Sequence, residues 1–315
     1  MLTEEQLAQY FRDGFLVVDS FFTEEELMPI EKCINAKVDV LARKLFDAGL
    51  IQDRFESEGF LTRLTKLDAA YPGAAVLIHT EGVLAPEIAE LWASEKLLGI
   101  AEQILGPEIA GHPVWNLRAK TPVNALATVP WHQDTAYLAA GSENTFQATA
   151  WIPLLDVTVE NGALQVVRGG DKIGNVYTHY LERKRGNRDS WYLYIPDETF
   201  EGADIVTCEV KRGAMVLLNN LIPHRSLENY SNVIRWSLDL RWQKPGEISG
   251  MEGEKDCILM RTASDPNYRP DWTEWALQSR QRRVLDDGQV VEPKKAELTT
   301  KVTGAWLDRW EKMER

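Results

Sequence analysis

The chain has 315 residues, of which 44% are hydrophobic and 26% are charged, a balance typical of a soluble globular protein. Its net charge is −13, so its field repels nucleic-acid phosphates and we expect no nucleic-acid partner. It has no run of about 20 apolar residues and no apolar segment among its acidic first residues, so we expect neither a membrane span nor a signal peptide.

Residues 1–108 are expected to form a mainly helical N-terminal layer. Thr3 and the acidic residues after it form a capping-box start, and Gly14 ends that helix. A strand-like FLVVDSFF run follows, and a second, longer helix extends from Thr23 to Leu45. A third helix is expected from about Ser94 to Leu105, ending before a Gly-Pro pair.

Residues 109–243 are expected to form a β core. The hydrophobic period falls towards two, and Gly, Pro, Asn or Asp bound several of the apolar runs. No helix-length segment alternates with these runs, which disfavours a parallel α/β sheet and favours a jelly roll. The expected strands are 110–119, 145–152, 162–167, 204–210, 214–219, 223–228 and 232–242.

Two regions complete the expected organisation as a single domain. Residues 171–203 interrupt the strands with aromatic and basic side chains, and their position suits a lid over the mouth of a site. Residues 244–315 are expected to return to helix, with tryptophans at 272, 275, 306 and 310. The three cysteines, Cys33, Cys208 and Cys257, are far apart and form no CxxC pair. We therefore expect free thiols in a reducing, cytoplasmic compartment.

Two of the five histidines stand in a pattern that suits a metal. His132 and Asp134 are two residues apart, so in an extended segment their side chains lie on the same side. A second imidazole, such as His224 from a distant strand, completes three ligands on one face and leaves three coordination positions open. Two-histidine, one-carboxylate iron oxygenases need this arrangement. Alone, the His-x-Asp triplet is a weak signal.

Arg235 follows His224 by eleven residues on a strand rich in Val, Ile, Trp and Leu. A cation in an apolar strand is costly unless it is paired. One interpretation is a buried ion pair with Asp239. The other is that Arg235 binds the distal carboxylate of a small diacid, which a guanidinium pairs with through two parallel hydrogen bonds.

Together these segments resemble the phytanoyl-CoA dioxygenase family, a branch of the iron(II)- and 2-oxoglutarate-dependent oxygenases. The resemblance rests on LTEEQLAQYFRDGFLVVDSFFTEEEL, WHQD, TAWIPLLDVTVENGALQVVRGGDK and the segment from His224 to Arg235. The pattern as a whole is specific, although its pieces are not. It implies a double-stranded β-helix core, a cupin-like jelly roll, wrapped by N- and C-terminal helices.

The resemblance also assigns roles to individual residues. It implies that iron(II) is held by His132, Asp134 and His224. Arg235 matches the residue that binds the distal carboxylate of 2-oxoglutarate, and Ser226 matches a hydroxyl that assists it, with Ser237 a competing candidate. Trp151 matches an aromatic residue that lines the cosubstrate pocket. The implied cofactors are Fe(II), 2-oxoglutarate and O2.

The implied reaction is hydroxylation of an unactivated C–H bond of a small molecule, with release of succinate and CO2. Halogenating relatives have a small residue where this chain has Asp134, which favours hydroxylation. A chain at −13 without a basic patch disfavours a CoA ester. The basic lid residues Arg183, Lys184 and Arg185 are either a solvated turn or an attraction for an anionic substrate. Trp131 is either a substrate contact or packing.

Two other functions are compatible with parts of this pattern. One is a different mononuclear metalloenzyme on a cupin-like barrel, which the position of Arg235 relative to His224 disfavours. The other is a ligand-binding relative without turnover, which is expected to have lost one of the ligands or the arginine. The sequence carries no signal for an oligomeric state.

Overall fold

The computed structural model describes residues 1–80, 82–185, 188–251, 255–265, 267–278, 283–284, 289–291, 298–302 and 307. Among these residues, no helix is both long enough and apolar enough to cross a bilayer. The helices are α1 (Glu4–Asp13), α2 (Glu24–Asp47), α3 (Arg63–Ala70), α4 (Ala74–Thr80), α5 (Pro86–Trp92), α6 (Glu95–Leu105) and α7 (Trp272–Trp275).

The three helices expected from the N-terminal sequence are confirmed. The hydroxyls of Thr3 and Thr23 each accept a backbone N–H at the start of α1 and α2, and Gln6 and Glu26 return the bond to the cap. Gly14 ends α1 with a φ of 79°, a left-handed conformation that glycine adopts without strain. The helices α3, α4 and α5 lie in the layer that was expected to be mainly helical, but they were not predicted individually. They have seven or eight residues each, and α3 and α5 start without a capping side chain.

All strand pairs of the core are antiparallel. The larger sheet has the order β1-β11-β4-β13-β2-β14, with β3 also paired to β13, and the smaller sheet has the order β10-β5-β12. The strands are β1 (Phe15–Val18), β2 (Ile109–Gly111), β3 (Asn116–Lys120), β4 (Ala148–Pro153), β5 (Leu164–Val167), β10 (Ile205–Cys208), β11 (Met215–Asn219), β12 (His224–Ser226), β13 (Arg235–Gln243) and β14 (Ile258–Arg261).

Side-chain alternation gives the larger sheet two different faces. On β11, Val216 and Leu218 pack with Leu164 and Val166 of the smaller sheet, so the two sheets face each other as the halves of a jelly roll. Met215 and Leu217 of the same strand point to the opposite face and pack with the helices. The expected jelly-roll fold is therefore confirmed.

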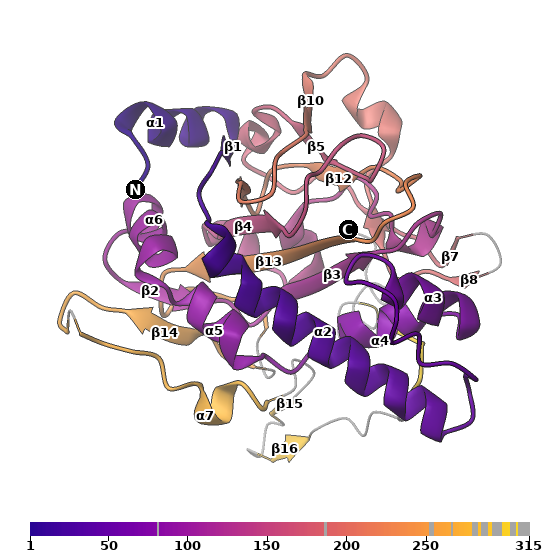
Figure 1. The fold of residues 1–315 in the computed structure, drawn as a ribbon. Helices are drawn as coiled ribbons and strands as arrows, with labels where there is room; N and C mark the ends of the chain where they lie inside the picture. The colour runs from indigo at the N-terminus through magenta and orange to yellow at the C-terminus, as the bar shows by residue number, and fades with distance from the viewer. Residues whose placement is uncertain are drawn as a thin grey trace.

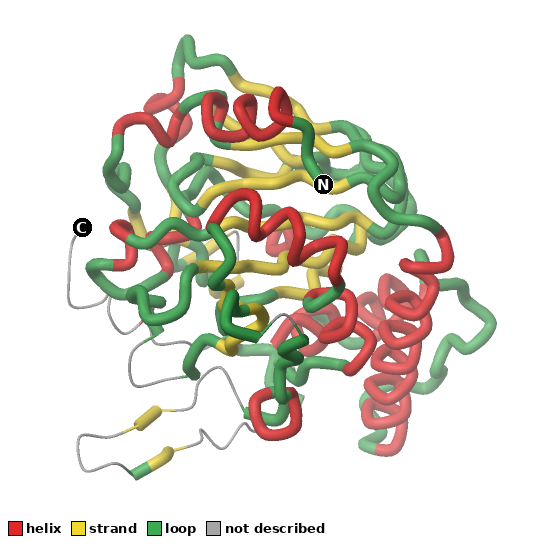
Figure 2. Tube along the Cα trace, turned by 90° about the vertical axis from the view of Figure 1, so that its left-hand side faces the viewer, coloured by secondary structure: helices red, strands yellow, loops and turns green. Residues whose placement is uncertain are grey.

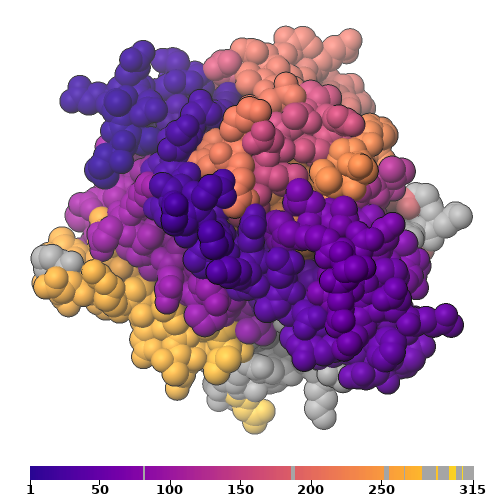
Figure 3. Space-filling model, in the orientation of Figure 1, coloured from indigo at the N-terminus to yellow at the C-terminus, as the bar shows by residue number. Residues whose placement is uncertain are grey.

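The N-terminal helices cover the outer face of the larger sheet. In Figure 1, α2 runs across the front of β13, and in Figure 2 the same long helix stands beside the strands. In the space-filling view of this side, residues coloured indigo to magenta hide most of the sheet (Figure 3). The residues that α2 buries recur every three or four positions: Leu27, Ile30, Cys33, Ile34, Val38, Leu41, Ala42 and Leu45.

Two expectations need correction. Residues 110–119 form two strands, β2 and β3, because His112 and Pro113 interrupt the run. The described part of 244–315 is not mainly helical: β14 pairs with β2 and extends the sheet, and α7 has only four residues. Trp306 and Trp310 lie outside the described residues.

The lid region 171–203 contains two small hairpins. The outer one pairs β6 (Tyr180–Leu181) with β9 (Leu193–Tyr194), and the inner one pairs β7 (Lys184–Arg185) with β8 (Arg188–Asp189). A third hairpin, of β15 (Arg283–Val284) and β16 (Val290–Val291), belongs to the C-terminal region.

Candidate active site

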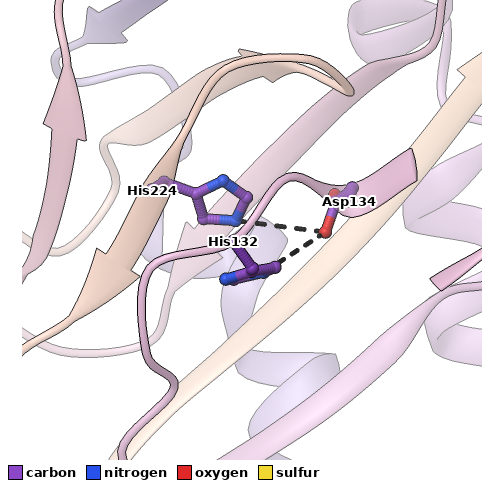
Figure 4. A group of neighbouring side chains, drawn as sticks. All are labelled: His132, Asp134 and His224. Atoms are coloured by element: carbon purple, nitrogen blue, oxygen red, sulfur yellow. Dashed lines mark ion pairs between the residues drawn. The ribbon is translucent and has the colours of Figure 1, made fainter. Parts of the chain in front are cut away.

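His132, Asp134 and His224 meet between the two sheets. Backbone bonds of 3.0 Å in both directions join His132 to His224, so a local ladder holds the two imidazoles side by side. Asp134 begins a short 3₁₀ helix directly after the His132 segment. Its Oδ1 lies 3.6 Å from Nε2 of His132 and 4.0 Å from Nε2 of His224 (Figure 4).

The hydrogen bonds of the two imidazoles orient them for metal binding. Nδ1 of His132 lies 2.9 Å from the carbonyl of Pro130, and Nδ1 of His224 lies 3.0 Å from the carbonyl of Ile222. A carbonyl only accepts, so each Nδ1 carries the proton and each Nε2 keeps its lone pair. Both lone pairs then face Asp134, an arrangement that imidazole ligands of metals commonly show.

Arg241 binds the other oxygen of Asp134. Its Nε and Nη2 donate to Oδ2 at 3.0 and 2.8 Å, and its Nη1 donates to the carbonyl of Val114 at 3.0 Å. Burial alone would raise the pKa of Asp134, but the guanidinium of Arg241 outweighs it and holds that pKa well below its ordinary value. Asp134 is therefore a carboxylate with one oxygen occupied by Arg241 and one facing the histidines.

His224 is a neutral base in this setting. Burial, with His132 nearby, lowers the pKa of His224 to about 4. A neutral imidazole and an ionised carboxylate are the protonation states in which these groups coordinate a metal. In the described part of the chain, only this group of His, Cys, Asp or Glu side chains brings three ligand atoms within 4.8 Å. Two nitrogens and one oxygen on one side of a point, with the other side open, fit iron(II).

Arg235 lies in the same cavity and is not ion-paired with Asp239. Its Nη1 donates to Ser237 at 2.8 Å, its Nε has no partner, and the guanidinium lies 5.2 Å from the ring centre of Trp151. Asp239 is instead bound by Arg118 at 2.6 Å, with Arg241 3.8 Å away. Burial lowers the pKa of Arg235 to about 10, so it remains a cation at neutral pH.

The cavity around the triad, called the metal cavity below, is lined by most of the residues expected from the sequence. Besides the triad they are Trp151, Ser226 and Arg235. The hydroxyl of Ser226 accepts the N–H of Val129 at 3.0 Å, so its own proton is available for an anion. Ser237 is fully buried, and its hydroxyl accepts a hydrogen bond from Nη1 of Arg235, so it helps to hold the guanidinium in place.

The residues expected to contact substrate lie elsewhere. Trp131 is buried beside Phe200, 5.1 Å between ring centres, and does not line the metal cavity. Arg185 is bonded to Glu182 and to the carbonyls of Ala125 and Thr128. Arg183 is exposed on the lid. Trp131 therefore packs in a hydrophobic cluster, and Arg185 joins the lid to the backbone of Ala125 and Thr128.

Five polar residues that line the cavity were not assigned to it from the sequence: Arg118, Thr149, Arg225, Asp239 and Arg241. A signal for Asp239 and Arg241 exists in β13, where Trp236, Leu238, Leu240 and Trp242 pack in the helix-covered core. The residues between them must face the other way. Arg241 is therefore on the same face as Arg235, six residues away.

Comparison with known proteins agrees with this geometry. Residues 10–237 match the model of the family described as phytanoyl-CoA dioxygenase (PhyH). A phytanoyl-CoA dioxygenase domain-containing protein 1 homolog of Dictyostelium discoideum is 24% identical over 264 residues, 73% of this chain and 87% of that protein. A probable alpha-ketoglutarate-dependent hypophosphite dioxygenase of Stutzerimonas stutzeri is 27% identical over 180 residues, 56% of this chain and 55% of that protein.

The fold is also found in a solved structure. EctD from S. alaskensis, crystallised with 2-oxoglutarate and 5-hydroxyectoine, matches with a TM-score of 0.52 and 20% identity, covering 86% of this chain and 82% of EctD. The family model covers well over half of the chain, and the metal cavity contains a His-Asp-His group whose ligand atoms lie within 4.8 Å of one another. This chain belongs to the phytanoyl-CoA dioxygenase family and is an oxygenase that depends on iron(II) and 2-oxoglutarate.

Proposed function

We propose that this protein hydroxylates an unactivated C–H bond of a small anionic molecule, with iron held by His132, Asp134 and His224. Arg235 and Ser226 bind the distal carboxylate of 2-oxoglutarate, and Trp151 lines its pocket. The observation that carries the proposal is the buried Arg235. It lines the same cavity as the triad, and no carboxylate of the described chain lies within ion-pair distance of it.

The protein residues contribute position, charge and exclusion of water. When bound, iron and 2-oxoglutarate supply the oxidising chemistry, in which dioxygen is consumed, succinate and CO2 are released and a hydroxyl group enters the substrate. The Nδ1–H bonds to Pro130 and Ile222 fix the two imidazole planes. Arg241 fixes the carboxylate plane of Asp134. The aliphatic wall formed by Val129, Leu164 and Leu218 limits access of water.

Two features support an anionic substrate. The Stutzerimonas stutzeri relative is named for hypophosphite, a small anion. With Arg225 set aside because it is paired with Asp197, the metal cavity is also lined by three arginines against two carboxylates. A neutral or cationic substrate would leave this excess of positive charge without a partner.

The site is tested by anaerobic reconstitution with iron(II) and 2-oxoglutarate, followed through the visible charge-transfer band of the complex. We expect a band in the wild type, no band in His132→Ala, and at least a tenfold higher 2-oxoglutarate requirement in Arg235→Gln. Arg225→Gln is the matched control, because Arg225 lines the same cavity but is paired with Asp197. Absence of the band in wild-type protein shown to contain iron would contradict the assignment.

The reaction is tested by incubation with candidate small anions under ¹⁸O2. Hydroxylation predicts one labelled oxygen in the product and one in succinate. A substrate-dependent release of succinate with an unlabelled, dehydrogenated product would contradict hydroxylation and leave the oxygenase class intact.

A further inference from the structure

A second cavity adjoins the metal cavity and is called the side chamber here. Its walls come from α4, the strand β3, the loop 124–129 and the lid residues Trp191 and Tyr192. It shares Arg118, Val129 and Arg235 with the metal cavity, whereas the three residues of the triad do not line it.

Lys120 is the unusual residue of the side chamber. It is 2% exposed, and its Nζ makes one hydrogen bond, to the hydroxyl of Thr128 at 3.1 Å. An ammonium has three donors, so two of them are unused within the described chain. No carboxylate lies within ion-pair distance of it there.

Lys120 also stands directly opposite Arg235. The two residues are register partners on the antiparallel strands β3 and β13. Side chains at such positions lie on the same face with their Cβ atoms about 5 Å apart, and like charges there repel. Both side chains are almost completely buried, which makes the repulsion stronger. Burial, with Arg235 opposite, lowers the pKa of Lys120 well below its ordinary value.

The arrangement of the lysine is built into the fold. Gly162 has a φ of +92°, and a Cβ at that position would lie 2.6 Å from Cδ of Lys120. The glycine therefore makes room for the stem of the lysine at this end of the jelly roll. A buried lysine for which the fold makes room, with no carboxylate of the described chain within ion-pair distance, indicates a ligand that supplies the negative charge.

The balance of charge identifies that ligand. Around the two cavities, Arg118, Lys120, Arg235 and Arg241 face Asp134 and Asp239, once Arg225 is set aside with Asp197. Iron(II) and the dianion of 2-oxoglutarate carry equal and opposite charges, so their binding leaves this excess of positive charge unchanged. A third species, the substrate, must offset it.

We propose that the substrate carries a carboxylate, phosphonate or similar oxyanion that binds to Lys120 in the side chamber, while its oxidised carbon extends past Val129 towards the metal cavity. This rests on the proposed function and adds the substrate class and its anchoring residue.

The test is calorimetric titration of the protein, loaded with manganese(II) and 2-oxoglutarate, with methylphosphonate as the anionic probe and its neutral dimethyl ester as the control ligand. Wild type is compared with Lys120→Met, which keeps the length of the side chain and removes the charge. Lys184→Met is the matched control, since that lysine is exposed and paired with Asp189 on the lid.

The expected result is that methylphosphonate binds the wild type and Lys184→Met alike, at least tenfold more weakly to Lys120→Met, and that the ester does not bind. Equal binding to Lys120→Met, no binding to the wild type, or binding that 2-oxoglutarate prevents would each overturn the proposal. In the last case the anion belongs to the cosubstrate pocket.

Thermal unfolding separates this role from a structural one. Removing an uncompensated buried charge should raise the Tm of ligand-free Lys120→Met above that of the wild type. A lower Tm with unchanged probe binding would make Lys120 a structural residue. If the wild type gives no iron and 2-oxoglutarate band but binds methylphosphonate through Lys120, the proposed function fails and the anion site stands.

Discussion

Asp134 owes its orientation to Arg241, whose Nε and Nη2 hold Oδ2 and leave Oδ1 to the histidines. Without this contact, the carboxylate is free to turn its plane or to offer both oxygens to a metal. The side chain of Arg241 is 5% exposed, so water is poorly placed to replace its hydrogen bonds to Asp134.

We expect Arg241→Met to weaken iron(II) binding by about tenfold or more, which is typical of residues that orient a metal ligand. Arg241→Lys should lie between wild type and Arg241→Met, because one ammonium does not reproduce two parallel guanidinium bonds. The measurement is competition for iron(II) with a chromophoric chelator, with Arg225→Met as control. Unchanged iron affinity, or a loss of 2-oxoglutarate affinity at saturating metal, would contradict this role.

Individual site residues were predictable from the sequence to different degrees. The triad and Arg235 have fixed spacings in a recognisable pattern, so sequence and structure point to the same side chains. Arg241 and Lys120 have no such spacing, and their roles come from what faces them across the cavity. Trp131 neighbours His132 in sequence, yet side chains alternate along an extended segment, so it points into another cluster.

At the scale of elements, the lid is tied to the loop that lines the side chamber. Arg185 donates to the carbonyls of Ala125 and Thr128 and lies over the ring of Tyr192. The basic residues of the lid were expected to attract substrate or to be solvated. The contacts of Arg185 favour a third role, in which it closes the lid over the chamber.

Arg185→Met should therefore loosen the lid without unfolding the protein. Loss of charge-assisted bonds to two carbonyls costs roughly 1 to 3 kcal/mol in local stability. We expect chymotrypsin to cleave at the aromatic residues of 177–194 several-fold faster than in wild type, with an unchanged global Tm. Lys184→Met is the control, and equal acceleration in that variant would show that general loss of lid charge, and not the tether, is responsible.

Elements were predictable where local and global signals agree. Most strands of the core carry apolar residues between turn residues, and they were expected within a few positions of where they lie, except that β2 and β3 were expected as one strand and β14 was not expected. The helices α3 and α5 have about two turns and no capping side chain, and only Pro86 at the first position of α5 gives a local signal for a helix start. β14 exists because β2 offers it a free edge, which is a tertiary cause that its own sequence does not carry.

At the scale of the whole molecule, two buried histidines outside the triad make stability depend on pH. Nδ1 of His112 accepts the N–H of Val114 at 3.1 Å, and Nε2 of His179 accepts the N–H of Gln133 at 3.0 Å. Each must be neutral to do so. Burial lowers the pKa of both to about 4.

The direction of this pH dependence follows from the protons that the unfolded state binds and the folded state does not. Between pH 6.5 and 4 the unfolded histidines are protonated and the folded ones are not, so the free energy of unfolding falls as the pH falls. From pH 7.5 to 5 we expect a loss of about 2 kcal/mol for each histidine. Urea unfolding of metal-free protein at both pH values measures it, and His112→Gln should show a shallower dependence. A free energy of unfolding that is equal at the two pH values would contradict the assignment.

The strand β13 supplies side chains both to the metal cavity and to the hydrophobic core. Along β13, Arg235, Ser237, Asp239 and Arg241 serve the cavity, and the four residues interleaved with them serve the helix-covered core. A deletion of one residue would exchange the two sets and put guanidinium groups among tryptophans. A deletion of two would keep the faces but move each side chain about 7 Å along the strand. The length of this strand is thus as constrained as its composition.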